Sequence, residues 1–201
     1  TTISDLVARL AGLDRSTALL GGGPTPDGRF SVFAHRPIAE WIVPAGAPPE
    51  FPPTGAWSAA PRPGPDVFDR LRTFASALRA TPGPFVGPFV GGVIAILGYD
   101  LRTSSEPSPD RKEADPTCPD LLARRFSAAL VHDAETGRAT VMRLVDPADP
   151  KFTAEAAERA EELLAAGRGG AATAPPPPPH VKLVRPVSTD APDTYRAKVA
   201  R

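Results

Sequence analysis

Apolar and polar residues recur with two periods along the chain, and each period predicts one kind of element. Residues 66–80 place an apolar side chain every three or four positions, so we expect a helix capped by Asp66. A second helix is expected from Thr153 to Ala166, stopping at Gly167, and a short first helix from Ser4 or Asp5 to about Gly12. The two longer apolar faces are Val67, Phe68, Leu71, Phe74 and Leu78, and Ala156, Ala160, Leu163 and Leu164.

Strands are predicted where apolar residues alternate or run together between turn residues. Residues 18–20 and 29–34 indicate a hairpin around GGGPTPDG, with Phe30, Val32 and Ala34 on one face of the second strand and Arg29, Ser31 and Phe33 on the other. Residues 124–146 indicate two further strands around a turn that ends at Gly137. The run GGVIAIL is expected to be a strand covered on both faces.

Proline divides the chain, because it fixes φ and removes a backbone donor. The 27 prolines concentrate in residues 42–65, 104–120 and 167–180, which are predicted to be loops, the last an extended Pro/Gly/Ala-rich linker. We therefore expect a domain over residues 1–166, a linker over 167–180 and the start of another domain over 181–201. The expected fold class is α+β, a mainly antiparallel sheet with helices on its outer face.

Composition excludes several functions. Lys+Arg and Asp+Glu both number 23, so no net positive charge is available to hold nucleic acid or an anionic membrane. The single cysteine, Cys118, forms no internal disulfide, and the charged N-terminus lacks the apolar stretch of a signal peptide. The aliphatic run 93–97 is far shorter than the roughly 20 residues of a membrane span. A cytoplasmic protein is expected.

Residues that often carry chemistry lack the spacing that chemistry needs. The glycines at 91 and 92 precede a strand, whereas a phosphate loop places them between a strand and a helix. The histidines lack the spacing of a metal site and are expected at the surface, and the acidic residues before position 121 are expected in a solvated loop. The serines near position 105 lack the sequence setting of a hydrolase nucleophile. The tryptophans are expected to be core or interface anchors. These residues are His35, His132 and His180; Asp110, Glu113, Asp115 and Asp120; Ser104, Ser105 and Ser108; and Trp41 and Trp57.

Several motifs stand in a familiar order over residues 16–145. The segments are ALLGGGPTPDGRFSVFAHRP, PFVGGVIAILGYDL with SSEP after it, and PDLLARRFSAALVHDAETGRATVM. Together they resemble the N-terminal domain of component I of aminodeoxychorismate synthase and anthranilate synthase, whose middle motif is F-x-G-G-x-x-G-x-x-G-Y-D-L-x-R-x-x-E. The chain departs from it at Ala95 and at Thr103–Ser104. It keeps Phe89, Gly91, Gly92, Gly98, Tyr99, Asp100, Leu101 and Glu106.

The resemblance implies where function does and does not lie. The family's active site, its magnesium-binding carboxylates and its catalytic lysine belong to a later domain, so no catalytic or metal-binding residue is expected in this chain and no chorismate turnover by it alone. The glycine motif is expected to be structural, through Gly91, Gly92, Gly98, Tyr99 and Asp100. The resemblance also implies that STDAPDTYRAKVAR begins the chorismate-binding domain, so we expect a fragment of a longer polypeptide, with the sheet surface that packs on that domain left exposed.

A vestigial tryptophan pocket is implied at the first hairpin, where Phe30 would supply an apolar wall and Arg29 a charge for a carboxylate. Its candidate residues are Gly22, Asp27, Gly28, Arg29 and Phe30. Gly22 stands where anthranilate synthases carry the serine of Leu-Leu-Glu-Ser, and a missing hydroxyl partner costs about 1–3 kcal/mol. We therefore expect no tryptophan binding below millimolar concentration.

The resemblance implies that the full-length subunit binds chorismate with Mg²⁺ and receives ammonia from a glutamine amidotransferase partner. Loss of the Leu-Leu-Glu-Ser motif favours aminodeoxychorismate synthase, which serves folate synthesis. Two alternatives stay open: anthranilate synthase component I, which serves tryptophan synthesis, and a stand-alone non-catalytic module that binds an amino acid.

Overall fold

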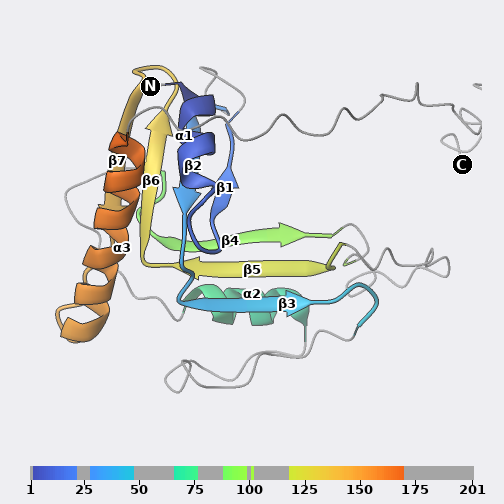
Figure 1. Ribbon diagram of the computed structural model, residues 1–201. Helices are drawn as coiled ribbons and strands as arrows, with labels where there is room; N and C mark the ends of the chain where they lie inside the picture. Colours follow the sequence, from blue (N-terminus) through green and yellow to red (C-terminus); the bar gives the residue numbers. More distant parts are fainter. Residues whose placement is uncertain are drawn as a thin grey trace, which may run out of the picture.

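The computed structural model describes residues 2–21, 28–47, 66–76, 88–98, 101 and 118–169. Within them the fold is α+β: all strand pairs are antiparallel and the helices lie outside the sheets (Figure 1). The helices are α1 (Ile3–Leu10), α2 (Val67–Ser76) and α3 (Pro150–Arg168). The strands are β1 (Thr17–Leu19), β2 (Phe30–Ala34), β3 (Ala39–Val43), β4 (Gly92–Leu97), β5 (Leu121–Phe126), β6 (Ala128–Asp133) and β7 (Arg138–Arg143).

The strands form two sheets, not the single sheet expected from the sequence. One has the order β1-β2-β6-β7 and the other the order β3-β5-β4. The chain passes between them twice, from β2 to β3 and, through the one residue Ser127, from β5 to β6. The strands of the two sheets cross in Figure 1, so a run of apolar residues that reads as one strand in the sequence bends from one sheet into the other.

The four-stranded sheet is covered on both faces. Phe33 and Leu130 pack against Leu6 and Leu10 of α1 and Leu163 of α3. The opposite face carries Val32, Ala34, Ala129, Val131 and Met142, which pack with Phe126 of the second sheet. The two-sided pattern predicted for residues 29–34 is confirmed. Phe30, Val32 and Ala34 pack in the cluster with Phe126, whereas Phe33 packs in the cluster with α1 and α3.

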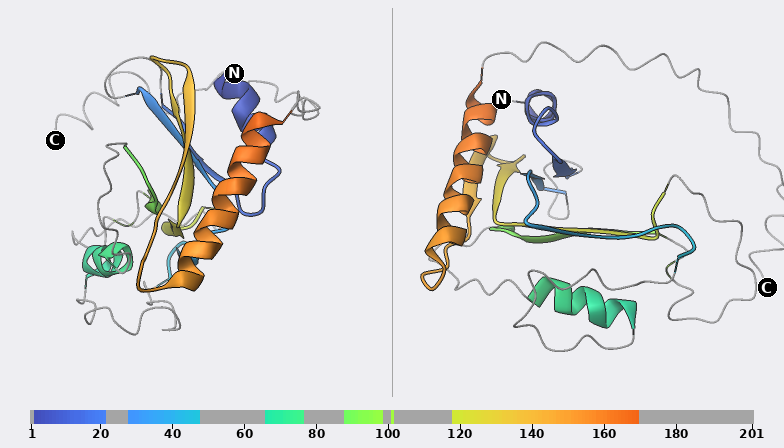
Figure 2. Two further views of the ribbon diagram at one scale, coloured as in Figure 1. Left: turned by 90° about the vertical axis from the view of Figure 1, so that its left-hand side faces the viewer. Right: turned by 60° about the horizontal axis from the view of Figure 1, so that its bottom comes forward.

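The three-stranded sheet is covered by α2 on one face, as the right-hand view of Figure 2 shows. Trp41 and Leu121 pack there against Phe74, and the buried Arg125 donates from Nη2 to the Phe74 carbonyl oxygen over 2.6 Å. The other face ends in a cross-strand row, Ile42–Leu122–Ile96. Ile42 is 47% exposed and Ile96 54%, so the prediction that residues 92–97 are covered on both faces is wrong. We call this row the open row.

The helix ends differ from the predicted ones because other side chains cap them. Thr2, not Ser4 or Asp5, caps α1: its hydroxyl accepts from the Asp5 amide while the Asp5 carboxylate accepts from the Thr2 amide. Asp149, not Thr153, caps α3 by accepting from the amide of Phe152, with Pro150 next in the chain.

Two predicted loop boundaries are also wrong. Helix α3 runs to Arg168, so Gly167 belongs to the helix and not to the linker. Ile42 and Val43 were placed in a proline-rich loop, yet they close β3, where they pair with Leu122 and Leu121. The remaining linker residues, 170–180, and the expected second domain, 181–201, lie outside the described residues.

Candidate functional site

The first hairpin carries the residues expected to line an amino-acid pocket. Strands β1 and β2 pair from Thr17–Ala34 to Leu19–Val32, as predicted. Gly28, Arg29 and Phe30 follow the turn, and Gly22 and Asp27 lie outside the described residues. The candidate pocket is therefore described only along its β2 side.

The guanidinium of Arg29 is held by two carboxylates, one at the end of β6 and one in the turn that follows. Its Nε and Nη2 donate to the two Asp133 oxygens over 2.8 and 2.7 Å, and its Nη1 pairs with Glu135. The hydrogen bonds from Arg29 hold the pKa of Asp133 well below its usual range, and the same contacts raise the pKa of Arg29. The guanidinium lies 4.9 Å from the centre of the Phe30 ring. The charge expected to meet a ligand carboxylate is thus neutralised within the chain.

Gly21 lies where the two sides of the hairpin come closest. A Cβ atom at this position would stand 2.1 Å from the carbonyl oxygen of Gly28 and 2.6 Å from that of Phe30. The Gly21 amide donates to the hydroxyl of the buried Ser31 over 2.9 Å. Backbone and the Ser31 hydroxyl, all from the hairpin itself, fill this point, so a side chain at position 21 has no room.

The glycine motif before and after β4 has conformational and steric causes. Gly91 and Gly92 have φ of +146° and +137°, a region that L side chains rarely adopt. A Cβ atom on Gly98 would stand 3.0 Å from the backbone of Asp120, whose carbonyl oxygen accepts from the Gly98 amide over 2.7 Å. Tyr99 and Asp100 lie outside the described residues. The glycines are thus required by backbone conformation at the start of β4 and by close contact with the Asp120 backbone after its end.

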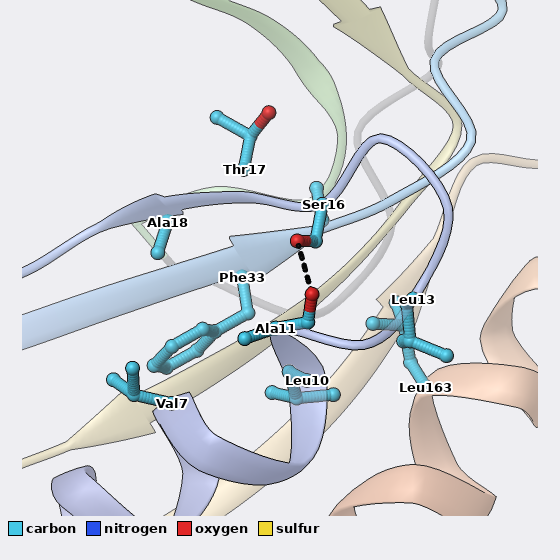
Figure 3. A pocket seen from close by; sticks show the side chains of 10 residues that line it. Val7, Leu10, Ala11, Leu13, Ser16, Thr17, Ala18, Phe33 and Leu163 are labelled. Atoms are coloured by element: carbon cyan, nitrogen blue, oxygen red, sulfur yellow. Dashed lines mark hydrogen bonds between the residues drawn. The ribbon is translucent and has the colours of Figure 1, made fainter. Parts of the chain in front are cut away.

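An apolar cavity of about 230 Å³ lies on the helical side of the same hairpin. Its walls come from α1, β1, β2, α3 and the segment between α1 and β1 (Figure 3). Phe33 of β2 and Leu163 of α3 line it, with Val7 and Leu10 on the α1 side. No sequence pattern indicated this cavity; only the short first helix, which supplies one of its walls, was expected.

Two predictions about polar residues are wrong for the described residues. His35 and His132 are 1% and 7% exposed and not on the surface. The Nε2 of His35 lies 3.1 Å from the carbonyl oxygen of Arg159 and 3.4 Å from Glu162 of α3. Asp120, expected in a solvated loop, is 7% exposed and accepts from the Gly46 amide. His180 and the remaining acidic and serine candidates lie outside the described residues.

Among the described residues no group of three or more His, Cys, Asp or Glu side chains is placed to hold a metal ion. In the same part of the chain, no helix has the length and apolarity to cross a bilayer. Trp41 is buried in the core under α2, as predicted, and Trp57 lies outside this part of the chain.

No protein-family model matches the chain. Among curated proteins, it is 30% identical over 147 residues to anthranilate synthase component 1 of Streptomyces coelicolor, covering 72% of this chain and 25% of that protein. It is 33% identical over 70 residues to aminodeoxychorismate synthase component 1 of Klebsiella aerogenes, covering 35% of this chain and 15% of that protein. Among solved structures, anthranilate synthase component I from Streptococcus pneumoniae is similar with a TM-score of 0.46 and 17% identity, over 76% of this chain and 32% of that one.

Both curated relatives are component I of a chorismate-utilising synthase, and these matches support placing the chain in that family. It spans a quarter or less of the length of these two relatives.

Proposed function

We propose that the chain is the N-terminal scaffold and regulatory part of an aminodeoxychorismate synthase component I. Its full-length form would aminate chorismate to 4-amino-4-deoxychorismate for folate synthesis. The proposal is supported by the matches to the family and by the state of the first hairpin. The part described here would hold and shape the protein, and the reacting groups would belong to the rest of the subunit.

The observation that carries the choice of product is the crowding at Gly21. When Leu19–Leu20–Gly21–Gly22 is matched to the Leu-Leu-Glu-Ser motif, Gly21 stands at the glutamate and Gly22 at the serine. A side chain at position 21 would meet the Gly28 carbonyl oxygen at 2.1 Å, and Arg29 is already paired with Asp133. A hairpin with neither the motif nor an available charge suits a synthase without tryptophan feedback, because feedback needs a built amino-acid pocket.

The open row supports the proposed covering by a chorismate-binding domain. Ile42, Leu122 and Ile96 form an apolar surface on the face of the sheet that α2 leaves open. Beside it the Arg124 Nε donates to Glu40 over 2.6 Å, which leaves a neutral polar margin. Apolar surface with a polar margin is typical of an interface. The glutamine amidotransferase, the requirement for Mg²⁺ and the cytoplasmic location are proposed for the full-length protein by the same family argument.

Anthranilate synthase component I is the second candidate. The longer curated match, over 147 residues, is to a protein of that name. The two candidates differ in product: an anthranilate synthase releases pyruvate, whereas an aminodeoxychorismate synthase keeps the enolpyruvyl group.

The test is to express this chain with whatever reading frame follows Arg201, and to supply chorismate, Mg²⁺ and ammonium. We expect the longer protein to give aminodeoxychorismate and the 201-residue chain to give no product. Anthranilate as the product would replace the proposal by the second candidate. Turnover by the 201-residue chain alone would refute the scaffold role.

Calorimetric titration with tryptophan adds a second measurement. We expect no binding below millimolar concentration by the chain or by its longer form. Micromolar binding by the longer form would show that the hairpin glycines do not decide affinity, and would favour the anthranilate synthase candidate. Micromolar binding by the chain alone, with no reading frame beyond it, would instead indicate a stand-alone amino-acid-binding module.

A further inference from the structure

The cavity beside the first hairpin is separate from the expected tryptophan pocket. It opens on the α1 side of the hairpin, at the Thr17–Ala34 end, whereas Gly28 and Arg29 stand at the opposite end of the strand pair. Phe33 points into it from β2, together with Leu163 from α3 (Figure 3). Ala11 and Ala18 line it from positions that are exposed to solvent, so they mark its entrance.

The size of the cavity fits one small molecule. At about 230 Å³ it is larger than the ~150 Å³ apolar cavity that is known to take up benzene. Two helices and two strands supply its walls, so apolar side chains surround the space from several sides. A molecule of one or two aromatic rings is small enough for a space of this volume.

The polarity of the walls selects the kind of molecule. The described residues that line the cavity are apolar except for Ser16 and Thr17, and none of them is charged. The Ser16 hydroxyl donates to the Ala11 carbonyl oxygen over 3.4 Å, and the Thr17 hydroxyl accepts from Arg124 over 3.1 Å. A carboxylate or ammonium group placed inside would lose its water and gain no counter-charge, which is strongly unfavourable.

We propose that this cavity is a binding site for a small, neutral, apolar aromatic molecule. The same argument excludes free amino acids, which carry two charges, and carboxylate substrates. The occupant would contact both α1 and β1, which supply facing walls of the cavity, and would add to the packing of the short helix on the sheet. This inference does not depend on the proposed function.

The test uses the 201-residue chain with toluene, and with benzoate as a charged probe of nearly the same shape. Thermal unfolding is followed with each compound, and methyl and aromatic NMR signals locate the bound molecule. We expect toluene to raise the Tm, to shift the signals of Phe33 and Leu163, and to bind at least 10-fold more tightly than benzoate. An absence of a toluene effect on the unmodified chain, or equal binding of benzoate, would overturn the site.

A pair of matched variants separates the cavity from general apolar surface. Ala18→Phe places a ring at the entrance, and Ala139→Phe makes the same change at an exposed position of β7 away from it. We expect toluene affinity to fall at least 10-fold in A18F and to stay within 2-fold in A139F. Ala11→Phe blocks the entrance from the helical side if A18F does not fold. Unchanged toluene binding in a folded entrance variant contradicts the proposal.

Discussion

The two sheets of this protein differ in how completely they are covered. The four-stranded sheet has α1 and α3 on one face and the second sheet on the other, so β2 and β6 are buried on both sides. The three-stranded sheet has α2 on one face, and the described residues cover its other face only near Phe126 and Ile94. Its far end is the open row. The first sheet is complete within this chain, whereas the second keeps an apolar surface for something else to cover.

This difference separates the residues that hold the fold from those that await a partner. In the closed region each apolar side chain contributes its burial to stability. In the open row the same kinds of side chain remain in water and contribute little until they are covered. Four expected effects, each tested with its own variants, check this comparison.

The largest effect is expected where the two sheets meet. Phe126 is fully buried and packs with residues of both sheets, so Phe126→Ala should lower the free energy of unfolding by about 3–5 kcal/mol. Ile96→Ala in the open row should cost less than about 1 kcal/mol, because half of the side chain is already exposed. Urea unfolding of both variants gives the comparison, and equal losses would contradict it.

The next effect concerns how β4 is entered. Gly92→Ala should lower the free energy of unfolding by about 1–3 kcal/mol, since the φ of +137° strains any residue with a Cβ atom. Gly12→Ala is the matched control, because nothing lies within 4 Å of a Cβ atom there and its φ is outside the strained range. Thermal unfolding should show a loss in G92A and almost none in G12A. A neutral G92A would mean that the entry to β4 can rearrange.

A third effect depends on pH. The folded-state pKa of Asp133 is lowered from the usual 3.8, first by the hydrogen bond from Arg29. The stabilisation is therefore fully present above about pH 4 and is lost as the pH falls below this value. Asp133→Asn should flatten the acid side of the plot of unfolding free energy against pH.

Arg29→Met is the control for the cause of this shift. It removes the donor and keeps the carboxylate, so its acid profile should be flattened in the same sense as that of D133N. The double variant should add nothing further. A profile of R29M that matches the unmodified chain would show that the lowered pKa of Asp133 has another origin.

The smallest effect on stability is expected in the open row. The double variant Ile42→Ser/Ile96→Ser should lower the free energy of unfolding of this chain by no more than about 1 kcal/mol. It should reduce the fluorescence of a bound apolar dye, because it removes exposed apolar surface. In the longer protein the same pair should weaken stability clearly. Equal effects in the two lengths of chain would argue against a covering domain.

The sequence predicted those parts of the fold whose causes are local. The hairpin of β6 and β7 follows from the polar turn and Gly137, whose φ is +67°. The break between β5 and β6 was missed because Ser127 has none of the usual marks of a break, and β3 was missed because prolines follow it directly. Two-sheet packing, which decides both, depends on contacts far apart in the chain.

The candidate site was predicted less well for the same reason. Arg29 was given a role toward a ligand, while its actual partner, Asp133, is 104 positions away and shows no sign of the pairing in its own neighbourhood. His35 was expected at the surface, and its nearest backbone acceptor, on Arg159, is 124 positions away. The glycines around β4 were identified because a doubled glycine before an apolar run is a local sign of unusual backbone.

Ser127 has a mechanical consequence. It is fully buried, it is the only residue between β5 and β6, and its carbonyl oxygen accepts from the Leu144 amide over 2.8 Å. A connection of one residue cannot extend, so a displacement of either sheet also displaces the other. The two sheets therefore cannot part in the way that two domains on a linker do. They should open together, in one step, and a protease should find no cleavage point between them until both are lost.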